Sequence, residues 1–206
     1  MEKEAFTSLR SLLGGLARAM NLINADVEHH HEQVAFLAYH IARELRFSQD
    51  ELTHTIYAAL LHDIGAIMFE KHCPIREIES KAQTVARMGA DMLRDIPGME
   101  VLTGIIEYCQ DSWTEAKRAI AQRQECQQGA RIAAVIHLAD AVTVAIDPNE
   151  TVLNQVDPIL KQVEQRKGTE FSEEAVDALL QISKNEYLWF DLLYNPNFLL
   201  DFFAGD

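Results

Sequence analysis

The sequence predicts an all-α protein, and three observations support that prediction. Apolar residues recur every three or four positions along most of the chain, which is typical of helices with one buried face. Helix-start patterns such as Ser48-Gln49-Asp50-Glu51 precede several of these stretches. No run of residues has the period of a strand, and no glycine-rich phosphate loop is present. We therefore expect a helical bundle.

Composition narrows the classes of protein to consider. A chain of 206 residues with 48% hydrophobic residues fits one large domain. The net charge of −14 disfavours nucleic-acid binding and favours capture of cations. We expect no membrane partner and a cytoplasmic location, because we find no secretory signal, no apolar run long enough to span a bilayer and no C-x-x-C pair. The cysteines are widely separated: Cys73, Cys109 and Cys126.

Residues 4–23 predict an amphipathic helix with a single apolar seam. We divide the chain into an N-terminal helix, 1–25, and a main domain, 26–206, that includes aromatic C-terminal helices. The N-terminal helix packs on its own domain or forms a dimer. The aromatic tail is a second candidate surface for a homodimer, and its first role is core packing.

The next helix is expected from about Asp26 to Leu45, with Asp26 as its N-cap. His30 lies on the buried stripe of this helix. His29 and His31 are rotated about 100° to either side, so only His30 is predicted to face inward. A lone histidine at the end of a stripe is also compatible with a simple buried polar group.

The central stretch of the sequence is 58–65, an apolar helix that ends in His62, Asp63 and Gly65. A carboxylate beside an imidazole at the end of an apolar run is costly to bury without a partner. A divalent cation would satisfy both groups, since both are ordinary ligands of zinc, iron or manganese. The alternative is a surface His-Asp pair at a helix end capped by Gly65.

Further helices are expected at about 77–95, 98–111 and 112–128, followed by the most apolar helix, 129–146. Asp140 is a carboxylate in the middle of that last helix, and His137 lies one turn earlier on the same side. Asp140 therefore requires a cation or a hydrogen-bonded partner such as His137 or Arg131. We expect a polar connection up to about Thr169, and then a helix capped by Ser172.

These separate indications converge on one site. His30, His62, Asp63 and Asp140 supply two imidazoles and two carboxylates from three helices. Such a set can bind one divalent transition-metal ion, such as iron, manganese, zinc or nickel, and leave positions open for water and substrate. That arrangement is the one needed for metal-assisted hydrolysis.

The sequence resembles the HD superfamily of metal-dependent phosphohydrolases, whose pattern is H…HD…D, and within it the HD-GYP branch. The resemblance covers about residues 28–185 and implies an HD-domain helical bundle with His30, His62, Asp63 and Asp140 as metal ligands. The matching segments are "HHEQV" (30–34), "AALLHDIGAI" (58–67), "GADMLRDIPGMEVLTGIIEY" (89–108), "ARIAAVIHLADAV" (130–142) and "FSEEAVDALL" (171–180).

The chain departs from the HD-GYP pattern where that branch adds histidines for a second or third ion. Val85 stands at one of these positions, and Cys109 and Gln110 stand at two others. Thr114 to Lys117 replace the glycine-rich GYP loop, and Ala66 replaces a lysine that often follows the HDIG motif. The single-metal set is complete, and the additional ligands are absent.

Two functions from different classes follow. The first is a phosphohydrolase that cleaves a phosphate ester or nucleotide, such as a cyclic dinucleotide, through a metal-activated water. Asp63 would take the proton from that water, and His137 would contact the phosphate or a metal ligand. The second is a degenerate HD-GYP-like signalling module that binds a partner or nucleotide without turnover. A bundle with no metal is a third alternative.

Overall fold

The structure, a computed structural model, describes residue 15 and residues 29–68, 81–122 and 127–195. Within those residues it contains helices and no strand, which confirms the predicted all-α fold. The elements in chain order are α2 (His30–Glu44), α3 (Gln49–Leu61), the 3₁₀ helix η2 (Ile64–Met68), α5 (Ala82–Leu93), α6 (Glu100–Tyr108), α7 (Trp113–Gln122), α8 (Gln127–Val144), α9 (Val152–Gln165), α10 (Glu173–Ile182) and α11 (Glu186–Tyr194).

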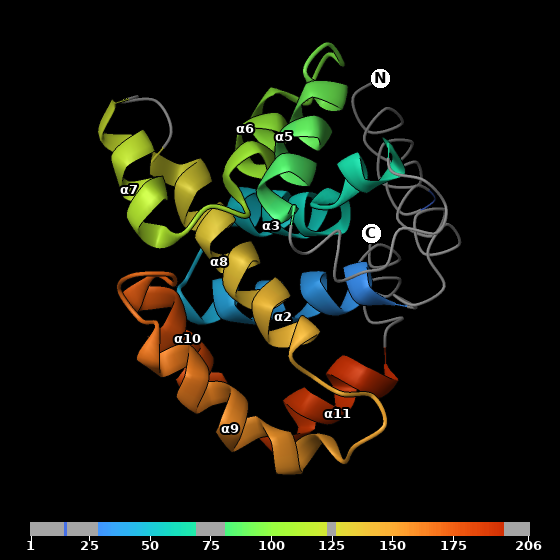
Figure 1. The fold of residues 1–206 in the computed structure, drawn as a ribbon, viewed down its shortest axis with the longest axis vertical. Coiled ribbons are helices and arrows are strands. Elements are labelled where there is room, and N and C mark those ends of the chain that lie inside the picture. The colour runs from blue at the N-terminus through green and yellow to red at the C-terminus, as the bar shows by residue number, and fades with distance from the viewer. Residues whose placement is uncertain (1–14, 16–28, 69–80, 123–126, 196–206) are drawn as a thin grey trace.

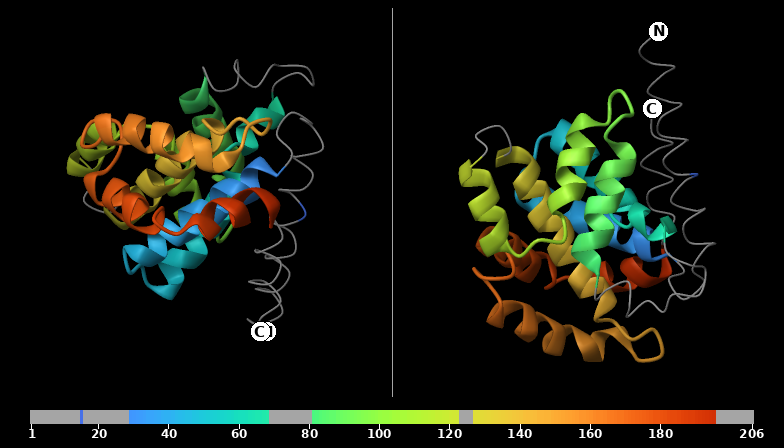
Figure 2. Two further views of the ribbon diagram at one scale, coloured as in Figure 1. Left: turned by 90° about the horizontal axis from the view of Figure 1, so that it is seen from below. Right: turned by 45° about the horizontal axis from the view of Figure 1, so that its top comes forward.

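Helix α8 is the centre of the bundle, as its uniformly apolar sequence predicts. It contacts α2, α3, α6, α7 and α10. Figures 1 and 2 show α8 crossing α2, with α5 and α6 on one side of α8 and α9 to α11 on the other. The predicted helix at 4–23 lies outside the described residues. Among the described helices, none is both long and apolar enough to cross a bilayer.

Helix α3 begins where its sequence predicts. The Ser48 side chain accepts a hydrogen bond from the Glu51 backbone N–H, and the Glu51 carboxylate accepts one from the Ser48 N–H. This reciprocal capping box satisfies two backbone donors of the first turn. The start of α2 was predicted wrongly, because its N-cap is His29, in a left-handed conformation with φ 65°, and not Asp26.

Two glycines allow η2 to pack against α5 at very short range. A β-carbon on Gly65 would lie 2.1 Å from the Val85 carbonyl oxygen and 2.7 Å from the Gly89 nitrogen. A β-carbon on Gly89 would lie 2.8 Å from the Ile64 side chain. Gly65 does not cap α3, whose C-cap is His62. It lets the segment that follows His62 and Asp63 lie directly on the backbone of α5.

The polar connection predicted up to Thr169 was wrong, because most of it is helix α9. Its buried residues recur at helical spacing, which predicts the observed helix: Val152, Val156, Ile159 and Val163. The many polar residues between them and Pro158 obscured this pattern. Proline removes one backbone donor in mid-helix, and packing of the apolar stripe outweighs that cost.

The last two helices agree with the sequence only in part. Helix α10 follows Ser172 as predicted, although the Ser172 side chain makes no capping hydrogen bond. In α11, Trp189 is buried in the core, whereas Tyr187 and Tyr194 are about three-quarters exposed. The aromatic residues after 195 lie outside the described part of the chain. The aromatic tail is thus core packing on one face only.

Candidate metal centre

The four histidine and aspartate residues predicted as ligands come together at the junction of three helices. His30 is the first residue of α2, His62 is the C-cap of α3, and Asp140 lies in α8. One ligand atom from each of these three residues lies within 4.8 Å of the other two. Asp63 follows His62 directly and joins the same group. We call these four residues the His–Asp cluster.

Distances within the His–Asp cluster match the spacing of ligands around one ion. His30 Nε2 lies 3.2 Å from Asp140 Oδ1 and 3.8 Å from Asp63 Oδ2. His62 Nε2 lies 3.2 Å from Asp63 Oδ2 and 3.6 Å from Asp140 Oδ1. Two ligands bound at about 2.1 Å lie about 3.0 Å apart at a right angle and about 3.4 Å apart in a tetrahedron. The atoms of His30, His62 and Asp140 are therefore close enough together to hold one ion, and the Asp63 oxygen lies beside the nitrogen of His62.

The orientation of His62 supports the same conclusion. Its Nδ1 donates a hydrogen bond to the Ala59 carbonyl oxygen at 2.7 Å, which leaves Nε2 directed into the cluster. Nε2 is buried, and although two carboxylates are close, neither contact has the geometry of a hydrogen bond. A buried nitrogen without such a partner is costly. A divalent transition metal fits this donor set, since imidazole and carboxylate are among its usual ligands.

The ionisable groups of the cluster shift one another's pKa values. Burial opposes ionisation of His62, but the carboxylates of Asp63 and Asp140 outweigh it and raise the pKa of His62 well above its usual value. Burial also opposes ionisation of Asp140, but the adjacent imidazoles of His30 and His62 hold the pKa of Asp140 well below the usual range. The cluster therefore contains carboxylates that are ready to bind a cation.

His31 also lies inside the bundle, so the prediction that only His30 faces inward was wrong. His31 is 3% exposed, and its ring centroid lies 5.4 Å from that of His30 and 5.5 Å from that of His62. Burial, followed by the nearby charges of His62 and His30, lowers the pKa of His31 to about 3. The first turn of α2 is therefore buried on a wider face than the single apolar stripe of the sequence predicts. A neutral His31 ring packs beside both imidazoles.

Sequence reasoning gave no role in the centre to Gln110, which donates a hydrogen bond from Nε2 to Asp140 Oδ2 at 2.6 Å. Gln110 follows the end of α6 and is 8% exposed. Its neighbour Cys109 is fully buried, and burial, together with the charges of Asp63 and Asp140, raises the pKa of the Cys109 thiol well above its usual value. The sequence signal that could have identified this contact is the position of Gln110, where the HD-GYP branch has a metal histidine.

His137 lies on the same helix as Asp140 but contacts a different group. Its Nε2 lies 3.3 Å from Glu170 Oε1, and Arg166 contacts the same oxygen at 3.3 Å. Backbone bonds hold Glu170 in place, because its carbonyl oxygen accepts from the Trp113 N–H at 2.7 Å. His137 thus links α8 to the α9–α10 loop. Its predicted role at the phosphate stays a prediction.

Two arginines, Arg87 and Arg131, pair with acidic residues. Arg87 Nη2 lies 3.1 Å from Asp111 Oδ1, and the guanidinium is half exposed. Arg131 lies over the Phe47 ring and within 4 Å of carboxylate oxygens of Glu51 and Glu174. The partner of Arg87, Asp111, directly follows Gln110 in the chain, which connects Arg87 to the His–Asp cluster.

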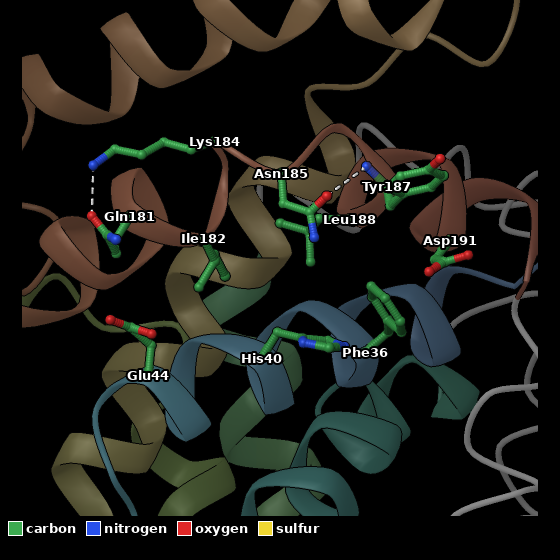
Figure 3. Close-up of a pocket in the computed structure, with 10 residues that line it drawn as sticks. All are labelled: Phe36, His40, Glu44, Gln181, Ile182, Lys184, Asn185, Tyr187, Leu188 and Asp191. Atoms are coloured by element: carbon green, nitrogen blue, oxygen red, sulfur yellow. Dashed lines mark hydrogen bonds between the residues drawn. The ribbon is translucent and has the colours of Figure 1, made fainter.

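A separate cavity of about 400 Å³ lies between α2 and the α10–α11 region. Figure 3 shows Phe36 and His40 from α2 on one side of it, and Leu188 and Tyr187 from α11 on the other. His40 is ten residues after His30, or about 15 Å along a helix axis. The cavity is therefore separate from the His–Asp cluster.

Comparisons with known proteins identify the family of the chain. Residues 27–145 match the family model of the HD domain. The chain is 25% identical over 195 residues to "3′3′-cGAMP-specific phosphodiesterase 1" of Vibrio cholerae, covering 90% of this chain and 44% of that protein. The chain thus spans less than half the length of that curated relative.

Two solved structures have a similar fold. Both are of the HD domain of the Listeria monocytogenes phosphodiesterase PgpH, one of them in complex with cyclic-di-AMP. Each aligns with a TM-score of 0.54 at 16% identity over 84% of this chain, and over 97% and 98% of the respective PgpH chains. At this level of identity the likeness establishes the fold alone.

Proposed function

The chain belongs to the HD domain family, and from that premise we propose that it is a metal-dependent phosphohydrolase that cleaves a cyclic dinucleotide. The observation that carries this proposal is the convergence of four ligand atoms in the His–Asp cluster at separations of 3.2 to 3.8 Å. The proposed ligands are His30, His62, Asp63 and Asp140. The proposed cofactor is one divalent ion of iron, manganese, zinc or nickel per chain.

The proposed reaction is hydrolysis of a phosphodiester. A bound divalent ion lowers the pKa of a water and offsets the charge that develops on the phosphoryl oxygens. The carboxylate of Asp63, which is 22% exposed, is the group best placed to accept the proton of the attacking water. The water oxygen would form a bond to phosphorus as the ester P–O bond breaks, and the departing alkoxide would take up the proton that Asp63 has accepted. His137 is a further candidate for contact with the phosphate.

The proposed substrate class rests on the relatives. The curated relative is named for hydrolysis of 3′3′-cGAMP, and one related HD-domain structure contains cyclic-di-AMP. A net charge of −14 repels a dinucleotide over most of the surface. The phosphates would therefore depend on local positive charge, from the ion and from Arg87, for their attraction to the site.

Finer assignments belong to the same proposal. We place the chain beside the HD-GYP branch, as a member with the single-ion ligand set. The domain division, with an N-terminal helix at 1–25 and an HD domain at 26–206, remains a proposal, as does a homodimer through that helix or the aromatic tail. A cytoplasmic location would suit an enzyme that acts on nucleotide second messengers.

A second candidate function is binding of a nucleotide without turnover. It is favoured by the groups that surround the cluster: Val85 and Cys109 are fully buried, and Gln110 hydrogen-bonds one of the proposed ligands. A centre that has lost part of its ligand shell could bind phosphates through one ion and hydrolyse them slowly. The two functions differ in turnover and agree in metal binding.

The deciding experiment compares the wild-type chain with His62→Ala and His54→Ala. Both histidines lie at or near α3, but the pKa of His62 depends on Asp63 and Asp140, whereas His54 is outside the cluster. We expect wild type and His54→Ala to bind one transition-metal ion and to hydrolyse 3′3′-cGAMP or cyclic-di-AMP. We expect His62→Ala to lose both properties.

Each result has a definite meaning. Metal binding and nucleotide binding without hydrolysis would favour the second candidate. Retention of metal and activity by His62→Ala would exclude the proposed centre. Circular dichroism of each variant would show that a loss of metal is not a loss of the fold.

A further inference from the structure

The two oxygens of Asp140 lie in different surroundings. Oδ1 faces the imidazoles, at 3.2 Å from His30 Nε2 and 3.6 Å from His62 Nε2. Oδ2 faces the other way and accepts the 2.6 Å hydrogen bond from Gln110 Nε2. One oxygen is thus available to a cation, and the other is already occupied by a donor.

The identity of the donor atom follows from the partner. An ionised carboxylate can only accept hydrogen bonds, so the part of the glutamine amide that lies 2.6 Å from it is the NH₂ group. A hydrogen bond to an ionised acceptor is short and strong. It fixes the rotation of the Asp140 carboxylate about its own axis, which determines the direction of Oδ1.

Gln110 is itself held firmly. It is 8% exposed and lies between two residues with fixed contacts, the buried Cys109 and Asp111. The Asp111 N–H donates to the Tyr108 carbonyl oxygen at 3.1 Å, and the Asp111 carboxylate pairs with Arg87. The amide is therefore presented to Asp140 by a short segment anchored on both sides.

We propose that Gln110 is a positioning residue that restricts Asp140 to one coordinating oxygen and thereby limits the centre to one ion per chain. The partial positive charge of the amide N–H stands where a second cation would have to approach Oδ2. A carboxylate that bridges two ions uses both of its oxygens, and here one of them is committed to Gln110. This inference rests on the proposed metal centre.

The test uses two substitutions at Gln110. Gln110→Met keeps the length of the side chain and removes the donor, so the orientation of Asp140 is released. Gln110→Glu keeps the shape and places a second carboxylate against Oδ2, which forms a pair of oxygens suited to a cation. The matched controls are Gln83→Met and Gln83→Glu. The Gln83 amide also donates to a carboxylate on another helix, that of Glu115 at 3.2 Å, but at an exposed position.

The probe is Co²⁺, whose visible absorption reports coordination geometry, together with titration calorimetry and elemental analysis of the full chain. We expect one Co²⁺ per chain in wild type and in both Gln83 controls. We expect Gln110→Met to bind one Co²⁺ about 10- to 100-fold more weakly, with an altered spectrum. We expect Gln110→Glu to bind two.

The outcomes separate this inference from the proposed function. An unchanged affinity and spectrum in Gln110→Met would overturn it, and so would a single site of wild-type affinity in Gln110→Glu or two sites in wild type. If Gln110→Met does not fold, the stoichiometry of Gln110→Glu decides alone. Absence of Co²⁺ binding by wild type would instead reject the metal centre itself.

Discussion

The two sides of Asp140 differ in every property that matters to a cation. On one side, His30 and His62 direct nitrogen atoms toward a shared point, and Asp63 adds a carboxylate oxygen. On the other side stands the amide N–H of Gln110, which follows the buried Cys109 in the chain. The first side supplies ligand atoms for a metal ion. The second side presents an N–H group, which repels a cation.

This contrast indicates that the number of ions a metal centre binds depends on the groups next to its ligands as well as on the ligands themselves. The cluster side is costly to bury without a cation, because its imidazoles and carboxylates have no other complete set of partners. The Gln110 side is satisfied within the protein. Changes on the two sides should therefore have effects of different kinds and sizes.

The largest effect is expected from Asp140→Asn, which removes the charge from the residue shared by both sides. An amide oxygen is a poorer ligand for a transition metal than a carboxylate oxygen. We expect metal affinity to fall by more than the roughly 100-fold that is typical for loss of an outer contact. Titration calorimetry measures the affinity. The control is Asp91→Asn, at an exposed carboxylate that pairs with Arg94, and equal affinities in the two variants would contradict the assignment.

The next largest effect is expected from Gly65→Ala. The added β-carbon would lie 2.1 Å from the Val85 carbonyl oxygen, so η2 must move away from α5 and carry Asp63 with it. We expect a loss of about 2–3 kcal/mol in the free energy of unfolding, measured by urea denaturation. The matched control, Gly104→Ala in α6, meets nothing within 4 Å and should gain up to about 1 kcal/mol. A neutral Gly65→Ala would show that the close approach is dispensable.

The sequence correctly predicted those parts of the fold in which a local pattern is compatible with a single structure. The capping box of Ser48 and Glu51 defines the start of α3. The all-round apolar sequence of α8 predicts its central place, because such a helix has no face for water. The four residues of the cluster were predicted to meet at one site, and the structure brings them close together; their role as metal ligands stays a prediction.

The sequence was insufficient where a residue's role depends on a neighbour distant in the chain. Gln110 and Asp140 are 30 residues apart, and although Gln110 stands where the HD-GYP branch has a metal histidine, that position does not predict a hydrogen bond to Asp140. His31 was predicted to lie off the buried stripe, but the surrounding helices bury it as well. Helix α9 was missed because Pro158 and many polar residues conceal its apolar stripe, and only packing against the bundle stabilises it.

A moderate effect is expected from pH on the cluster side. A raised pKa means that His62 without a bound metal keeps its proton to a higher pH than an ordinary histidine, and metal binding requires the neutral imidazole. Affinity should therefore increase up to about 10-fold per pH unit below the pKa of His62, with release of about one proton per ion. Calorimetry in two buffers of different ionisation enthalpy measures that proton. His54→Ala should keep this behaviour, and a pH-independent affinity without proton release would contradict the coupling.

The smallest effect is expected from Cys109, the neighbour of Gln110 in the chain. Burial and the neighbouring carboxylates raise the pKa of its thiol, so the folded state favours the neutral form. The unfolded chain loses this proton above a pKa of about 8.5, and the native thiol keeps it, so stability falls as pH rises above that value. Between pH 7.5 and 9.5 we expect wild type to lose about 1 kcal/mol more of unfolding free energy than Cys109→Ala, measured by urea denaturation without metal. Parallel pH profiles would mean that the thiol ionises in the folded protein, and Cys109 would then be a ligand available to a second ion.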